Sequence, residues 1–250
     1  MSSSQSWPEL AREIGARRGR VAIGLHLDLT MRPFDGARPP MRLADIVRAA
    51  WTRRLDAGAL TAEFERQFDR FEAVLGFPPD HVDGHQHVHA LPQARDALLA
   101  VLSRRYGGGS PRGARPLVRA PGDSPARILL RPGARRKALT LAALGAGMAR
   151  RVRAAGFATN IGFSGFSRFV EGESYAAELA DALRSPGPRH LVMCHPGFAD
   201  DALARLDPLL GRRDEEYAAL MARADLLQSM IRIDRPADQA GSAFAFWTAP

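Results

Sequence analysis

Three short apolar stretches that each lead to a histidine constrain the fold of this chain more than any other feature. The histidines are His26 after Val-Ala-Ile-Gly-Leu, His85 after His-Val-Asp-Gly, and His195 after Leu-Val-Met-Cys. Helical patterns separate these stretches, and strands that alternate with helices favour parallel βα units. Polar groups at the carboxyl ends of parallel strands are typical of the active face of a (β/α) barrel. The sequence therefore predicts an α/β chain in which three distant histidines converge.

The other expected elements follow from hydrophobic periodicity and from the positions of Gly and Pro. We expect helices within 1–20 and at 43–56, 61–75, 92–105, 134–155, 175–183 and 214–230. Strands are expected at 21–25, 117–119, 160–166 and 190–193. Since no second domain is visible, these elements predict a single catalytic domain over 1–233. The aperiodic segment 234–250 is expected to be a loosely ordered tail.

The charge of the chain at first suggests a nucleic-acid-binding protein. Its formal net charge is +8, but 34 of its 35 basic residues are arginines scattered along the chain, and Lys137 is the one lysine. Because no recognition motif accompanies the charge, nucleic acid is not expected as a partner. The Arg-flanked helix at 134–155 has an apolar centre too short to cross a bilayer, which leaves peripheral membrane contact open. Residues 1–20 lack the apolar core of a signal peptide, so we expect a cytoplasmic protein. Cys194 is expected to be buried packing.

The segment from Asp80 to His89 holds four of the seven histidines of the chain. Imidazole and carboxylate groups together hold divalent metals or move protons. In an extended chain alternate side chains share a face, which would bring Asp83, His85, His87 and His89 together. A surface loop with a fortuitous histidine cluster is the alternative. Because histidine-rich tracts usually bind metal, a divalent-metal site is the working hypothesis.

Other catalytic motifs are missing from the sequence. It has no GxSxG nucleophile elbow, no P-loop and no GxGxxG that opens a helix. Acyl-enzyme, nucleotide-hydrolysing and dinucleotide-binding functions therefore have no support.

Three motifs in order carry a resemblance to a known family. GLHLDLT at Gly24–Thr30, HVDGHQHVHALP at His81–Pro92 and MCHPGF at Met193–Phe198 resemble those of the YdjC/ChbG carbohydrate deacetylases, including the hopanoid-biosynthesis-associated HpnK branch. The resemblance covers about residues 21–227. It implies a (β/α) barrel-like deacetylase fold, one divalent metal ion (magnesium or zinc), and hydrolysis of the N-acetyl amide bond of N-acetylated carbohydrates or glycolipids. A homodimer is left open.

The resemblance also implies roles for individual residues. His26 and His85 match the two metal-binding histidines of the family, and His195 matches the histidine of its HPG motif, a general acid or substrate-binding group. Arg119 corresponds more weakly to a basic residue after a short strand. The residues expected to bind substrate are Arg119, His87 and His89.

The start of the chain departs from the family pattern. Family members open with a strand that carries Asp-Asp-Phe-Gly, a source of a metal ligand and of the general base, and no such motif precedes Gly24. The fold is therefore expected to be incomplete at the N-terminus. Asp83, as a catalytic carboxylate, or Asp28, as a substitute carboxylate, would have to replace the missing group. The alternative function is a catalytically impaired sugar- or metal-binding relative of the family.

Overall fold

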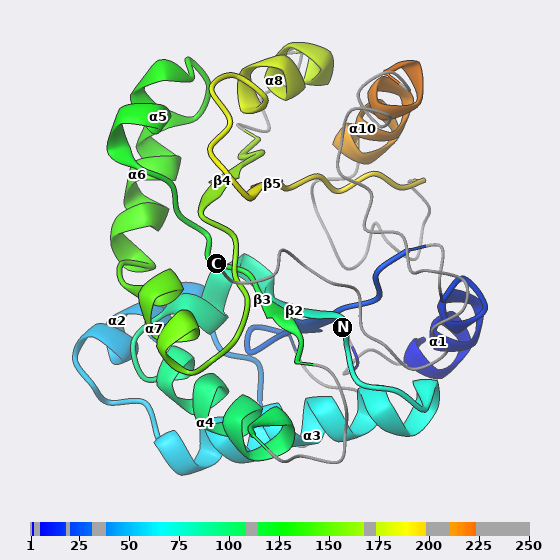
Figure 1. The fold of residues 1–250 in the computed structure, drawn as a ribbon, viewed down its shortest axis with the longest axis vertical. Helices are drawn as coiled ribbons and strands as arrows, with labels where there is room; N and C mark the ends of the chain where they lie inside the picture. The colour runs from blue at the N-terminus through cyan, green and yellow to red at the C-terminus, as the bar shows by residue number, and fades with distance from the viewer. Residues whose placement is uncertain are drawn as a thin grey trace. The chain divides into compact units, whose positions relative to one another are not determined.

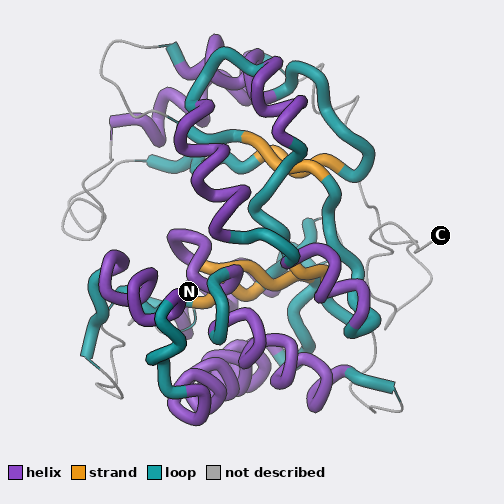
Figure 2. Tube along the Cα trace, turned by 90° about the vertical axis from the view of Figure 1, so that its left-hand side faces the viewer, coloured by secondary structure: helices purple, strands orange, loops and turns teal. Residues whose placement is uncertain are grey.

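The computed structural model describes residues 2, 6–18, 21–31, 39–108, 115–167, 174–198 and 211–223 (Figure 1). These residues form an α/β fold whose strands, orange in Figure 2, pair in parallel within two sheets. The chain divides into two compact units. The first takes the described residues of Met1–Ala120 and Leu144–Thr159, and the second those of Pro121–Ala143 and Asn160–Arg232.

The first unit is built on a three-stranded parallel sheet. Its strands are β1 (Leu25–Leu27), β2 (His81–Gly84) and β3 (Leu117–Val118), with β2 in the centre. Its helices are α1 (Trp7–Gly15), α2 (Leu43–Trp51), α3 (Ala57–Leu75), the 3₁₀-helix η1 (His85–Ala90), α4 (Ala94–Tyr106) and α7 (Met148–Ala154). The register places Leu25 opposite Val82 and His26 opposite Asp83.

Helix α3 supplies much of the core of the first unit. The Asp56 side chain caps its start by accepting a hydrogen bond from the Ala59 N–H, and Gly76 ends it with a left-handed φ of 73°. Its aromatic stripe, spaced at helical intervals, is fully buried and consists of Phe64, Phe68 and Phe71. In Figure 1 α3 lies beside α4, which contributes buried leucines to the same core.

The second unit has a two-stranded parallel sheet. Its strands are β4 (Gly162–Ser164) and β5 (His190–Val192). Its helices are α5 (Pro125–Leu130), α6 (Arg135–Leu144), α8 (Tyr175–Ala182) and α10 (Gly211–Ala222). Among the described residues of the chain, no helix is long and apolar enough to span a bilayer.

The elements expected from the sequence are largely confirmed, with four corrections. The helix expected at 43–56 ends at Trp51, because Asp56 already caps α3, which begins at Ala57 and not at 61. Strand β1 begins at Leu25, so His26 lies within the strand and not after it. The helix expected at 134–155 is interrupted before α7, because Gly147 adopts a left-handed φ of 80°. Helix α5 was not predicted from the sequence. The closed barrel and the single domain over 1–233 stay predictions, and the tail at 234–250 lies outside the described residues.

Candidate functional site

His26 and Asp83 form the centre of the candidate site. Leu25 and Leu27 point into the core, with exposed fractions of 1% and 0%, so the alternation of the strand directs His26 to the other face. On the neighbouring strand Asp83 lies opposite His26 in the register. The His26 Nδ1 atom is 2.6 Å from Asp83 Oδ1. This pairing fixes the imidazole with its Nδ1 atom on the carboxylate.

Arg119, which follows β3, binds the second oxygen of Asp83. Its Nη1 atom lies 2.6 Å from Asp83 Oδ2, and its Nη2 atom donates to the Gly84 carbonyl at 2.9 Å. The same Nη2 atom is 3.3 Å from His87 Nδ1. The Arg119 carbonyl oxygen is 2.9 Å from His89 Nε2. Arg119 is thus a buried organiser of the motif, and its substrate-binding role stays a prediction.

The electrostatics of this cluster follow from burial and from Arg119. Burial raises the pKa of Asp83, but the charges of Arg119 and His26 outweigh it and hold the pKa well below its usual range. Burial, reinforced by Arg119, lowers the pKa of His87 to about 2 and that of His89 to about 3. Asp83 is therefore an ionised hydrogen-bond acceptor near neutral pH, and His87 and His89 are neutral.

The histidine motif does not continue as an extended strand, so the expectation that alternate side chains share one face is wrong. After Gly84 the chain turns into η1, where Gln86 and His87 both have left-handed backbones with φ of 50° and 60°. Each such residue costs about 1–2 kcal/mol. The turn places the ring of His85 edge-on to the ring of His26, with 5.7 Å between their centroids. His26 and His85 are therefore brought together by the β1–β2 pairing and this turn.

The Asp28 carboxylate accepts hydrogen bonds from residues of the turn that follows β1. Its side chain is buried and its Oδ1 atom accepts hydrogen bonds from the Thr30 N–H and hydroxyl, both at 2.9 Å. Its Oδ2 atom accepts from the Met31 N–H at 3.0 Å. Gln67 of α3 binds both backbone polar groups of Asp28. These hydrogen bonds show that the Asp28 carboxylate shapes the turn after β1, and its role as a substitute carboxylate stays a prediction.

His195 belongs to the second unit and is exposed, three residues beyond the end of β5. Its backbone N–H donates to the carboxylate of Glu216 on α10, and the Gly197 N–H donates to the Arg213 carbonyl at 3.3 Å. No motif in the sequence indicates that α10 holds this loop. Cys194 is exposed, so the expectation that it is buried packing is wrong. The convergence of His195 with the other two histidines stays a prediction.

Comparison with known proteins gives the family. The model of the YdjC-like proteins matches residues 1–227. The chain belongs to the YdjC-like family. Chitooligosaccharide deacetylases from Yersinia pestis (strain Pestoides F) and Yersinia pseudotuberculosis (strain IP 31758) are each 40% identical to it over 101 residues. These matches cover 38% of this chain and 39% of each relative.

A solved structure supports the fold of this YdjC-like chain. It is a crystal structure from Enterococcus faecalis V583, of a protein described as a cellobiose-phosphate cleavage protein. The TM-score is 0.57, with 18% sequence identity over 92% of this chain and 81% of the other. At that identity the likeness concerns the fold alone.

The YdjC-like chain places side chains that can bind a divalent metal around His26. Imidazole nitrogens suit zinc, and a carboxylate on the far ring nitrogen, like Asp83 on His26, commonly orients a metal-binding histidine. His26 and His85 therefore fit two ligand positions. Within the described ranges, however, no three His, Cys, Asp or Glu side chains gather as a metal-binding group. Catalytic zinc usually takes three protein ligands, so the described residues form a partial site.

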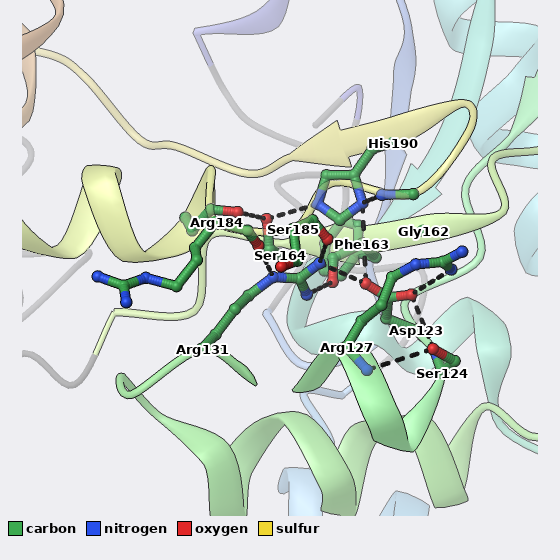
Figure 3. A network of polar contacts seen from close by, with 12 residues as sticks. Asp123, Ser124, Arg127, Arg131, Gly162, Phe163, Ser164, Arg184, Ser185 and His190 are labelled. Atoms are coloured by element: carbon green, nitrogen blue, oxygen red, sulfur yellow. Dashed lines mark hydrogen bonds and ion pairs between the residues drawn. The ribbon is translucent and has the colours of Figure 1, made fainter. Parts of the chain in front are cut away.

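A second polar cluster, in the second unit, has the composition of a Ser-His-Asp triad (Figure 3). The Ser164 hydroxyl lies 2.8 Å from His190 Nε2, but it donates its proton to the Ala182 carbonyl at 2.7 Å. His190 Nε2 must then be the donor to Ser164, while Nδ1 accepts from the Gly187 N–H at 3.4 Å. A catalytic serine needs the opposite direction, with its proton passed to the histidine.

The acidic residue of this cluster, Asp123, lies closer to two arginines than to His190. Asp123 is buried and pairs with Arg131 at 2.7 Å and with Arg127 at 3.3 Å, whereas His190 Nδ1 is 3.7 Å away. Arg131 also donates to the carbonyls of Arg184 and Ser185 (Figure 3). The cluster is therefore a structural network that joins α5 and α8 to the two-stranded sheet.

The His190 network predicts acid sensitivity. Burial and the Arg131 charge lower the pKa of His190 to about 4; Arg127 acts in the same direction, and Asp123 opposes it. Between about pH 6.5 and 4 the unfolded chain binds the proton more readily, so stability falls as the pH falls through this window. His190→Gln, which keeps a donor for Ser164, is expected to remove roughly 1–3 kcal/mol of that loss. Urea unfolding at pH 7.5 and 4.5 measures it, and an unchanged pH dependence in the variant would contradict the network.

Proposed function

We propose that this YdjC-like protein is a metal-dependent deacetylase that hydrolyses the N-acetyl amide bond of N-acetylated carbohydrates or glycolipids. The observation that carries the proposal is the approach of His26 and His85, whose ring centroids are 5.7 Å apart although they belong to separate motifs. Family membership supports it, and so does the partial identity to proteins named chitooligosaccharide deacetylases. Because those matches span about 39% of the relatives' length, activity and substrate are proposals here.

In this proposal His26 and His85 would hold the metal, and imidazole ligands favour zinc over magnesium. A bound divalent metal polarises an amide carbonyl and lowers the pKa of water. Asp83 accepts a hydrogen bond from the Nδ1–H of His26, so the Nε2 lone pair of His26 would be the one available to a metal. Arg119 keeps Asp83 ionised and fixed in place. In this proposal Asp83 orients His26, and its role as the catalytic carboxylate stays a prediction.

His195 is the proposed proton donor. Its imidazole is exposed, and its backbone N–H donates to the carboxylate of Glu216 on α10. A protonated imidazole at this position would protonate the departing amine of the sugar.

A binding-only relative is the second candidate function. It is favoured by the finding that the described residues contain two candidate imidazole ligands and no group of three. Such a protein would bind metal or N-acetylated sugar without releasing acetate.

Metal content and acetate release together test the proposal. The purified chain is expected to contain about one equivalent of zinc or magnesium by elemental analysis. It should also release acetate from N,N′-diacetylchitobiose. In His26→Ala/His85→Ala both the bound metal and the acetate release should fall by about 100-fold or more.

His190→Gln, which alters a histidine of the other unit, is the matched control and should keep both properties. Metal content unaffected by the double substitution would contradict the site. Bound metal without acetate release would favour the binding-only relative.

A further inference from the structure

Helix α2 of the first unit carries an exposed apolar side chain at each of its ends. Leu43 is 37% exposed and Trp51 is 53% exposed, whereas Ile46 and Ala50 are buried in the core. Leu43, Val47 and Trp51 recur at intervals of four residues, so they follow one side of the helix. One face of α2 therefore packs inside the first unit, and a second apolar side reaches solvent at both ends of the helix.

The segment around Trp51 is positively charged. Residues 42–56 contain four arginines and two aspartates, and one of these aspartates, Asp56, caps α3. The other, Asp45, lies 3.5 Å from Arg48. Arg53 and Arg54 follow Trp51 closely, are exposed, and make no ion pair with any residue that the structure describes. Two cationic side chains beside an exposed indole ring are thus available to an anionic partner.

The turn that carries these side chains is held by hydrogen bonds. The Arg54 N–H donates to the Ala49 carbonyl at 2.8 Å, and Arg53 has a left-handed backbone with a φ of 55°. The side chain of Gln93 binds both backbone polar groups of Leu55, at 3.1 Å to the N–H and 2.9 Å to the carbonyl. A preorganised surface loses less entropy when it binds a partner.

The chemistry of these side chains indicates the kind of partner. An indole ring is stable at the level of lipid headgroups, where its N–H remains hydrated and its ring contacts acyl chains. Arginines next to it would meet the phosphates of anionic lipids. A nucleic acid would bind the arginines but would offer no apolar phase to Leu43 at the other end of α2. A bilayer surface satisfies the charged and the apolar side chains together.

Helix α7 lacks this combination, although it is also rich in arginine. Arg150 and Arg153 are exposed and likewise have no ion-pair partner among the described residues. The apolar side chains of α7, Met148 and Val152, are buried in the core. The sequence left membrane contact open for the segment that contains α7, but the exposed apolar side chains favour α2.

We propose that Leu43, Trp51, Arg53 and Arg54, the α2 surface, bind peripherally to a bilayer that contains anionic phospholipids. In this arrangement the Trp51 ring lies at the level of the headgroups, and Arg53 and Arg54 contact lipid phosphates. The inference does not depend on the proposed deacetylase activity.

The test measures sedimentation of the full-length chain with vesicles of equal parts phosphatidylcholine and phosphatidylglycerol, at about 0.1 M salt. Arg53→Gln/Arg54→Gln is expected to lower the partition coefficient about 30-fold, and Trp51→Ala about 10-fold. The matched control, Arg150→Gln/Arg153→Gln, removes the same charge from α7 and should lower it less than about threefold. Unchanged urea midpoints show that the variants fold.

A second measurement reports insertion of the ring. Brominated phosphatidylcholine in the same vesicles should quench the tryptophan fluorescence of the wild type. The quenching should be lost in Trp51→Phe, which keeps an aromatic ring at this position.

Three results would overturn the proposal. Equal weakening by the two arginine pairs would show that vesicle binding reflects the net charge of the chain. Quenching that persists in Trp51→Phe would place the lipid contact elsewhere. Binding to a single-stranded oligonucleotide that Arg53→Gln/Arg54→Gln weakens, without partition of the wild type onto vesicles, would assign the α2 surface to nucleic acid.

Discussion

Arg119→Met is expected to lower the free energy of unfolding by about 3–5 kcal/mol. Arg119 is buried, and its Nη1 atom lies 2.6 Å from Asp83 Oδ2. The substitution leaves the Asp83 carboxylate without its cation and the Gly84 carbonyl without its donor. Urea unfolding at pH 7.5, followed by circular dichroism, measures the loss.

Two further variants separate this effect from the loss of any arginine. Arg48 makes an exposed ion pair with Asp45 at 3.5 Å, so Arg48→Met should change stability by no more than about 0.5 kcal/mol. Adding Asp83→Leu to Arg119→Met removes the stranded charge and should restore a large part of the stability. Equal effects of Arg119→Met and Arg48→Met would show that Arg119 does not organise the motif.

Gly165→Ala is expected to be similarly damaging, because Gly165 combines a left-handed backbone with a close neighbour. Its φ is 89°, and a Cβ atom there would lie 2.0 Å from the Met193 carbonyl oxygen and 2.6 Å from the Met193 nitrogen. A flexible side chain could move aside, but these are backbone atoms of the segment that leads to His195. We expect a loss of about 3 kcal/mol or more, together with reduced function of the His195 loop.

Gly76 provides the matched control. Its φ of 73° is similarly left-handed, but nothing lies within 4 Å of a Cβ built there. Gly76→Ala should therefore cost about 1–2 kcal/mol, the conformational term alone. The difference between the two variants, measured as shifts in urea midpoint, isolates the contact with Met193. If both variants lose the same stability, the close approach of the Gly165 and Met193 segments would be contradicted.

Features that follow from local periodicity were predictable. The apolar stripe of α3 needed only helical spacing, and the Gly76 stop needed only the known preference of glycine for a left-handed backbone. The proximity of His26 and His85 was also predictable, because adjacent parallel strands bring their carboxyl ends to one edge. For these features the relevant information lies within a few residues or in the general rules of parallel sheets.

Features that depend on tertiary packing were not predictable. Gln86 and His87 carry no glycine or asparagine signal for their left-handed backbones, so the motif resembled an extended strand. Arg119 is one of 34 arginines, and only the assembled sheet distinguishes it by placing Asp83 beside it. The start of α5 was a missed local signal, because Ser124 before Pro125 is a recognisable N-cap.

The register of β1 against β2 links the chemistry of the molecule to its folding. A slip of one residue would turn His26 into the leucine-lined core and place Leu25 or Leu27 opposite Asp83. Any ligand that requires His26 and His85 together would therefore bind only chains whose sheet has paired correctly. By mass action, such a ligand would stabilise the native register over every shifted one. Binding would therefore increase the fraction of chains whose strands are paired correctly.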